Sequence, residues 1–424
     1  MLAALTLAHS LQQPEEPAPP PAPARVEVVE RLLLTVPEQF ALGTLDPAFA
    51  PGGARVAFTA DLDDGRAVVF SEGAVSEPHD FVHVPRFSAD GQHVAWVWGN
   101  RIKKDHEEWE LMLDGKRVKK ADWIGAVVFA PVGSDYAVWT GDDVRIDGDG
   151  DYAGGEYTCT WGKKKADGYS DAPWQDPQWS ADGKHLGFIA VKPSRMMAVL
   201  DGKESGPYSF AMGFTWSTDG KTAAWSAREN YERILIYSGK KSYGQEYESV
   251  GAPALGPGGV MAYLASTRGR RVLVFRDAMV PGFYDDLGTP CVSADGKQVV
   301  VAANQGRKDE RSGWFFDNSW MDGALTWKED EAAVAKAGSV CFLVLNGNKL
   351  GTDWWRVVRP FFSPDARHVA ARARNADGWQ VLLDDRASPA YDRVDSLRFS
   401  DDGKFLEFGA RRGRELLWVR IAID

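Results

Sequence analysis

The chain is a succession of short apolar runs separated by tight polar turns, and it shows almost no helical periodicity. The clearest example spans residues 179–190, where an apolar run leads into Ser180-Ala181-Asp182-Gly183 and a second apolar run follows. In such a turn, Ser or Asp caps backbone N–H groups with its side chain, and Gly adopts the positive φ. The stretch therefore predicts a β-hairpin.

This hairpin pattern recurs along most of the chain. Further copies begin at Phe87, Trp216, Val292, Phe362 and Phe399, and worn copies begin at Phe49, Phe129 and Leu255. Most successive copies start 37 to 42 positions apart, with one interval of 50 and one of 70. A period of this length, with room for four short strands, is typical of a propeller blade.

The two ends of the repeat region are complementary. Residues 416–421 end the last unit without an outer strand, whereas Leu32-Leu33-Leu34 precedes the first unit and has no hairpin of its own. We predict that this N-terminal strand completes the last blade and closes the ring, which removes an exposed sheet edge. The expected fold is all-β, a single β-propeller over residues 26–424 with eight or nine four-stranded blades. Nine hairpins would give nine blades, but propellers usually have four to eight, so one of the less regular copies is allowed to form no full blade.

The turn sequence also carries a family resemblance. The pattern in Phe362-Ser363-Pro364-Asp365 and its copies resembles the WD-repeat-like repeats of TolB-type propellers and of the propeller domain of the prolyl oligopeptidase family. The resemblance implies the fold and leaves the function open, because binding scaffolds and enzymes share this fold. The chain has no Gly-x-Ser-x-Gly elbow, so the hydrolase half of that family is not expected. The segment before the repeats is too short for the N-terminal domain of TolB.

The first 25 residues differ in composition from the repeats. Residues 1–13 contain an apolar segment that resembles part of a signal peptide, without a Lys or Arg start and too short to span a membrane. Residues 14–25 are rich in Pro and Glu, as in an extended linker. We expect an exported, periplasmic or extracellular protein with no membrane span. The alternative interpretation of residues 1–13 is a disordered N-terminal tail.

Composition narrows the kinds of partner. The formal net charge of −11 argues against nucleic acid as a partner, because nucleic acid needs a basic surface.

The three cysteines are odd in number and widely spaced, so we expect core residues and neither a disulfide framework nor a metal site. His93, His185 and His368 occupy the same place in three repeats, which indicates a structural role. We expect a monomeric ring without a cofactor, calcium excepted.

Antiparallel strand order divides the ring into two faces. The first-to-second and third-to-fourth turns of every blade lie on one face, which we call the turn face. The second-to-third loops and the links between blades lie on the other, which we call the loop-rich face. Variable loops on a rigid scaffold usually carry binding sites, so we expect binding at the loop-rich face.

Two insertions belong to that face. In the third unit, Asp147, Asp149 and Asp151 alternate in a Gly-rich loop, a spacing that suits a calcium ion; the alternative is a solvated acidic turn. In the seventh unit, an insertion over residues 304–338 contains Trp314-Phe315-Phe316 and Trp320. Long insertions with aromatic residues are often functional, so this one is either a lid packed on neighbouring blades or a platform for a ligand or partner.

The late units are rich in arginine. Five candidate binding residues lie in their second-to-third loops: Arg268, Arg270, Arg271, Arg411 and Arg412. Such a basic arc favours an acidic peptide, a sugar acid or another anionic partner, and the alternative is ordinary solubilising charge.

We find no zinc-binding His-Glu-x-x-His motif and no phosphate-binding loop, and we assign no catalytic residue. The sequence therefore favours a non-enzymatic β-propeller scaffold that binds a protein or peptide partner through its loop-rich face. The alternatives are an exported lyase or hydrolase that acts on an anionic glycan at the channel mouth, and a structural subunit of a larger assembly.

Overall fold

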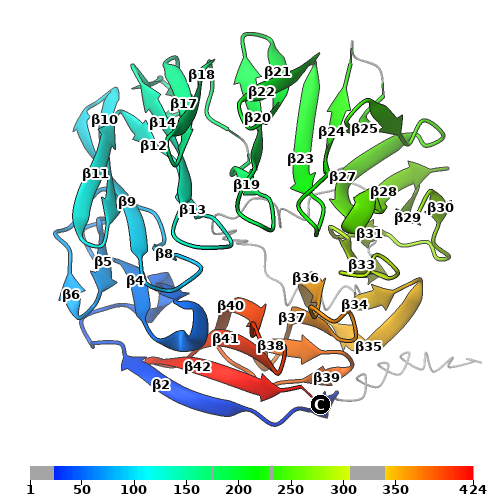
Figure 1. The fold of residues 1–424 in the computed structure, drawn as a ribbon. Helices are drawn as coiled ribbons and strands as arrows, with labels where there is room; N and C mark the ends of the chain where they lie inside the picture. The colour runs from blue at the N-terminus through cyan, green and yellow to red at the C-terminus, as the bar shows by residue number, and fades with distance from the viewer. Residues whose placement is uncertain (1–22, 174, 230–232, 306–339, 424) are drawn as a thin grey trace, which may run out of the picture.

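The computed structural model describes residues 23–173, 175–229, 233–305 and 340–423. Within this part of the chain, the strands form nine radial sheets and one small separate hairpin, and Figure 1 shows the sheets arranged as a ring. The protein is therefore an all-β propeller with nine blades, at the upper limit of the prediction. Each worn copy of the repeat forms a blade of its own, because blades 1, 3 and 6 pair as the other blades do.

The first three blades begin the ring. Blade 1 contains β3 (Asp46–Phe49), β4 (Val56–Asp61), β5 (Ala67–Ser71) and β6 (Ala74–Val75). Blade 2 contains β7 (Phe81–Val82), β8 (Arg86–Phe87), β9 (Val94–Lys103), β10 (His106–Leu113) and β11 (Lys116–Ala121). Blade 3 contains β12 (Trp123–Ile124), β13 (Val128–Phe129), β14 (Tyr136–Asp142), β17 (Glu156–Trp161) and β18 (Lys164–Tyr169). The separate hairpin is β15 (Arg145–Ile146) with β16 (Tyr152–Ala153).

Blades 4 to 6 continue it with four strands each. Blade 4 contains β19 (Gln178–Trp179), β20 (Leu186–Lys192), β21 (Arg195–Leu200) and β22 (Lys203–Tyr208). Blade 5 contains β23 (Phe210–Trp216), β24 (Ala223–Arg228), β25 (Leu235–Ser238) and β26 (Lys241–Tyr243). Blade 6 contains β27 (Ser249–Leu255), β28 (Met261–Thr267), β29 (Arg270–Phe275) and β30 (Ala278–Met279).

Blades 7 to 9 complete the ring. Blade 7 contains β31 (Asp286–Leu287), β32 (Cys291–Val292), β33 (Val299–Gln305), β34 (Val340–Leu345) and β35 (Asn348–Trp354). Blade 8 contains β36 (Arg356–Phe362), β37 (Val369–Asn375), β38 (Gly378–Leu383), β39 (Arg386–Ala387) and β1 (Ala24–Arg25). Blade 9 contains β40 (Arg393–Phe399), β41 (Phe405–Arg412), β42 (Glu415–Ala422) and β2 (Val29–Thr35). Three short 3-10 turns are η1 (Leu42–Thr44), η2 (Pro51–Gly53) and η3 (Pro257–Gly259).

The N-terminal strand closes the ring, as predicted. β2 pairs antiparallel with β42 from Val29↔Arg420 to Thr35↔Glu415, and Figure 1 shows the two strands side by side. The chain already joins a sheet at β1, which pairs parallel with β39 of blade 8. The last residues of the segment expected to be a linker are therefore hydrogen-bonded to a blade. The apolar segment in residues 1–13 lies outside the described residues.

The hydrophobic core lies between neighbouring blades. Trp139 and Tyr157 of blade 3 pack with Phe188 of blade 4, and the Trp139 and Phe188 rings meet edge to face at 4.9 Å. The blades approach closely at Gly187, where a Cβ atom would lie 2.0 Å from the ring of Phe214. Large aromatic side chains therefore fill the wedge between blades where a small residue faces them.

The cysteines agree with their expected role in the core. Cys159 is buried, Cys291 and Cys341 are partly buried, and all three are free thiols. Burial raises the pKa of the Cys291 thiol to about 11 and also raises that of Cys159. These thiols are protonated at neutral pH and behave as small apolar residues.

Candidate binding face

The turn face is built from one repeated hydrogen-bond unit. In six blades the Ser hydroxyl of the turn donates to the Asp carboxylate two residues later, at 2.5 to 2.7 Å, and accepts a backbone N–H from five residues later. The six pairs are Ser88–Asp90, Ser180–Asp182, Ser217–Asp219, Ser293–Asp295, Ser363–Asp365 and Ser400–Asp402. Ser and Asp therefore cap the turn as the sequence predicts, and their polar groups are used by the fold.

The hydrogen bond from each Ser lowers the pKa of its Asp partner. The effect is largest at Asp365, where the Ser363 hydroxyl is the main cause and the pKa falls to about 2. The other five carboxyl groups shift in the same direction for the same first reason. A carboxylate that accepts several hydrogen bonds is stabilised in its charged form.

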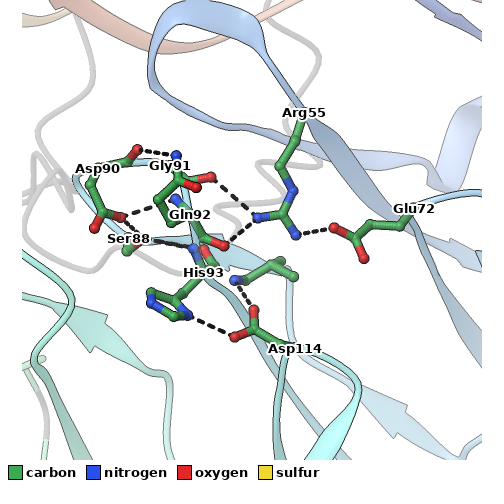
Figure 2. Close-up of polar contacts among 9 residues, drawn as sticks. Arg55, Glu72, Ser88, Asp90, Gly91, Gln92, His93 and Asp114 are labelled. Atoms are coloured by element: carbon green, nitrogen blue, oxygen red, sulfur yellow. Dashed lines mark hydrogen bonds and ion pairs between the residues drawn. The ribbon is translucent and has the colours of Figure 1, made fainter.

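Neighbouring blades are tied together on this face. Figure 2 shows Arg55 of blade 1, which donates to the backbone carbonyls of Gly91 and Gln92 in the blade 2 turn and forms an ion pair with Glu72. Arg276 of blade 6 likewise donates to the Gly296 carbonyl in the blade 7 turn, at 2.6 Å. These contacts fix each turn relative to the next blade.

The three repeated histidines belong to the same framework. His93, His185 and His368 each place Nδ1 within 2.6 to 2.8 Å of an Asp carboxylate in the third-to-fourth turn of their own blade. The second oxygen of each Asp accepts a backbone N–H from the residue after the histidine, as Figure 2 shows for Asp114. This geometry agrees with a structural role for the three histidines.

The strand order places the predicted binding residues on the loop-rich face, but they belong to several different blades. Arg268 lies in the β28–β29 loop of blade 6, Asp147 in the β15–β16 loop of blade 3, and Arg411 at the end of β41 in blade 9. The candidate residues Trp314, Phe315 and Trp320 follow β33 of blade 7 and lie outside the described residues.

The five candidate arginines differ in whether their guanidinium groups form ion pairs. Arg271 forms an ion pair with Asp286 of the next blade, and Arg412 forms one with Glu30 of β2, so both guanidinium groups hold the ring together. Arg268 and Arg270 are exposed and have no ion pair within the described part of the chain. Nε of Arg411 is buried without a hydrogen-bond partner among the described residues.

The acidic loop of blade 3 forms an ordered hairpin. The Asp147 carboxylate accepts hydrogen bonds from the backbone N–H groups of Asp149 and Asp151, at 2.9 and 3.0 Å. Among the residues that the structure describes, no group of three or more His, Cys, Asp or Glu side chains is arranged to hold a metal ion. Asp147 therefore has a turn-stabilising role, and the calcium site stays a prediction.

A buried carboxylate, which the sequence analysis missed, holds this hairpin against blade 2. Tyr152 donates its hydroxyl to Glu107 Oε2 at 2.9 Å, and Glu107 also accepts from Trp109 Nε1 and from the Arg101 guanidinium. Glu107 is 3% exposed, and burial followed by this hydrogen bond raises the pKa of Tyr152. Because the contact spans 45 positions, no local pattern in the sequence could have indicated it.

A second missed residue is Phe283, in the link from β30 to β31. Its side chain is 49% exposed, and the guanidinium carbon of Arg270 lies 5.3 Å from the centre of its ring. Phe283 has no counterpart in the other repeats, so the repeat pattern could not single it out. The nearest signal in the sequence is an aromatic residue in a link between blades, after Pro281-Gly282.

Among the solved structures similar to this chain are β-propellers. The β-propeller domain of the trilobed protease from Pyrococcus furiosus is 17% identical over 62% of this chain and 90% of its own length, with a TM-score of 0.32. TolB from Acinetobacter baumannii is 12% identical over 76% of this chain and 79% of its own, with a TM-score of 0.30. The Dos1 propeller is 9% identical over 94% of this chain and 95% of its own, with a TM-score of 0.40.

The chain spans 49% of the length of the acylaminoacyl peptidases that it also matches. No protein-family model matches the sequence, and no curated protein is significantly similar to it. Among the described residues, none of the helical segments has the length and hydropathy needed to cross a membrane. The blade count and the ring closure follow from the strand pairing of this chain itself.

Proposed function

We propose that this propeller is a non-enzymatic scaffold that binds a protein or peptide through its loop-rich face. The supporting observation is the difference between the two faces. On the turn face, the repeated Ser, Asp and His side chains bond to the chain itself. The loop-rich face carries the docked β15–β16 hairpin and the exposed guanidinium groups of Arg268 and Arg270. Loops held by a rigid scaffold are the usual place for binding.

The charge of the loop-rich face favours an acidic partner. Arg268, Arg270 and Arg411 have no carboxylate partner within the described residues, although the whole chain carries a net charge of −11. A local basic arc on an acidic protein attracts an anionic partner over short distances, since salt screens charges beyond about 10 Å.

An affinity capture from the native organism tests this proposal. The bait is the intact chain, compared with a loop-face variant, R268E/R270E/R411E, and with a matched turn-face variant, K221E/K297E/K404E. Both variants change the net charge by the same amount, so a loss caused by charge alone affects them equally. We expect a partner that is captured by the intact chain and by the turn-face variant and is lost from the loop-face variant. Equal capture by all three baits would contradict binding at the loop-rich face.

The aromatic segment after β33 is a further part of the proposal. We propose that Trp314, Phe315 and Trp320 contribute to the same partner contact. Replacement of residues 306–339 by a short Gly-Ser link is then expected to weaken capture and to leave the melting temperature of the ring unchanged. A strong loss of thermal stability would instead support the interpretation of this segment as a lid packed on the blades.

Calcium binding at Asp147, Asp149 and Asp151 is tested separately. If the ion binds there, addition of calcium raises the melting temperature of the intact chain, because a ligand that binds only the folded state stabilises it. The D149N/D151N variant is expected to lose this shift. The absence of a shift in the intact chain would indicate that these carboxylates bind no calcium and serve only the turn.

We also propose export from the cytoplasm, supported by the apolar segment in residues 1–13. Cell fractionation is expected to place the protein in the periplasm or the medium, and deletion of these residues is expected to retain it in the cytoplasm. Cytoplasmic location of the intact chain would contradict this proposal.

A further inference from the structure

We propose that Arg268, Arg270 and Phe283 form a platform for an acidic peptide segment in which an apolar side chain lies next to a carboxylate. This inference rests on the proposed function and names the part of the loop-rich face that makes the contact. Arg268 lies in the β28–β29 loop of blade 6, Arg270 is the first residue of β29, and Phe283 lies in the link from β30 to β31.

The β28–β29 loop is a rigid two-residue turn. Arg268 and Gly269 both have positive φ, at 51° and 69°, as in the tight turns that match the twist of a β-hairpin. The Glu248 carboxylate accepts from the backbone N–H groups of Arg268 and Gly269, at 2.8 and 3.4 Å. The backbone of the tip is therefore fixed while the Arg268 side chain is exposed.

The link that carries Phe283 is fixed in a similar way. Gly282 has a φ of 126°, and a Cβ atom there would lie 2.4 Å from the Tyr284 hydroxyl, so this position requires glycine. Tyr284 forms an isolated β-bridge with Arg271 of β29. The Phe283 ring is thus held beside the hairpin and is half-exposed, with the Arg270 guanidinium over it.

The charges around the Phe283 side chain favour an anionic partner. Arg271 is neutralised by Asp286, and the Glu248 carboxylate is directed at the turn backbone. Arg268 and Arg270 have no ion pair within the described residues. The Arg270 guanidinium lies over the exposed Phe283 ring, and Arg268 is two positions earlier in the same hairpin. Carboxylates bind guanidinium groups through charge-assisted hydrogen bonds, and an apolar side chain gains by covering the ring.

A peptide satisfies both requirements better than other anions. Nucleic acid would meet the repulsion of a chain with a net charge of −11. Aromatic residues and arginine are enriched at the centres of protein interfaces, where they contribute most of the binding energy. A rigid aromatic and cationic platform therefore fits an Asp- or Glu-rich segment with an adjacent Phe, Leu or Ile.

A random peptide display library, selected on the intact chain, tests the inference. The selected peptides are then titrated against F283A and R268Q/R270Q and against the control M279A. Met279 is a matched control because its side chain is also 49% exposed and belongs to the same blade, but it lies on the outer strand β30. We expect selected peptides with acidic residues next to an apolar one. Affinity is expected to weaken about tenfold in F283A and R268Q/R270Q, and to stay unchanged in M279A.

Two results overturn the inference. Selected peptides without acidic residues contradict the partner chemistry, and peptides that bind all variants equally place the contact elsewhere while leaving the proposed scaffold function intact. If no peptide is selected, the platform is rejected as a peptide site, and the three-bait capture then decides the proposed function independently. Unchanged melting temperatures of the variants show that the ring itself is preserved.

Discussion

Glu30 and Arg412 form a two-point ion pair across 382 positions of the chain, with distances of 2.9 Å from Nη1 and 2.5 Å from Nη2. The Tyr391 hydroxyl donates to the same carboxylate at 2.6 Å. Hydrogen bonding from Arg412 is the main cause that lowers the pKa of Glu30. The N-terminal strand is therefore fastened to blade 9 by side chains as well as by its backbone pairing with β42, and it does not merely cover a sheet edge.

Removal of the closing strand should destabilise the whole ring. Deletion of residues 26–43 removes β2 and exposes the backbone groups of β42 along an edge. We expect a melting temperature that falls by many degrees in differential scanning calorimetry. A deletion variant that melts at the temperature of the intact chain would show that blade 9 is stable without β2.

Arg414 should be a second fastening point. Its guanidinium donates to the backbone carbonyls of Val36, Pro37, Glu38 and Phe40, at 2.8 to 3.3 Å. R414Q is expected to lower the free energy of unfolding by about 2 kcal/mol, because these hydrogen bonds involve a charged donor. R145Q is the control, since the Arg145 side chain is 76% exposed and should contribute almost nothing. Equal urea midpoints for the two variants would refute the role of Arg414.

Backbone strain in the turns gives a third prediction. Gly403 has a φ of 70° and open space where a Cβ would lie, so G403A isolates the cost of the left-handed conformation, about 1 kcal/mol. Ala366 occupies the matching position of blade 8 with a φ of 62°. A366G should change stability less than G403A, because relief of strain is offset by loss of a buried methyl group. Equal and large losses in both variants would contradict this explanation.

The lowered pKa values of the turn carboxylates predict how the stability of the fold depends on pH. Their folded-state pKa values lie below the unfolded value of about 3.9, so the unfolded chain binds more protons as the pH falls. The stability they contribute is present above about pH 4 and is lost as the pH falls toward about 2, the pKa of Asp365. Urea midpoints measured at pH 5, 4 and 3 should therefore decline, and S363A should raise the pKa of Asp365 observed by NMR. An unchanged pKa in S363A would exclude the hydroxyl as its cause.

The contact between Tyr152 and Glu107 should hold the acidic β15–β16 hairpin against blade 2. Y152F leaves a buried carboxylate with one hydrogen bond fewer, so we expect faster hydrogen–deuterium exchange over residues 145–153. D149N is the control, because the contribution of Asp149 to the turn comes from its backbone N–H. Identical exchange in Y152F and the intact chain would show that the hairpin is held by other contacts.

The sequence predicted the fold well because its signals are local and repeated. The hydrogen bond between Ser180 and Asp182 recurs between the equivalent Ser and Asp of every clear copy, and Leu32-Leu33-Leu34 could be matched to the missing outer strand by counting strands. The ion pairs of the arginines were not predictable, because Arg271 pairs with Asp286 of the next blade and Arg412 pairs with Glu30, which is 382 positions away on the N-terminal strand of blade 9. The exposure of Phe283 likewise depends on how two connections meet in space. Contacts of this kind leave no pattern within one repeat.

Site-specific photo-cross-linking tests most directly whether the loop-rich face binds the partner. A benzoylphenylalanine residue replaces either Phe283 or Lys297, which lie at opposite ends of the first strand of blade 7, on the loop-rich and turn faces respectively. The complex captured from the native organism is then irradiated. We expect a covalent adduct with the partner from position 283 and none from position 297. An adduct from position 297 alone would place the partner on the turn face and contradict binding at the loop-rich face.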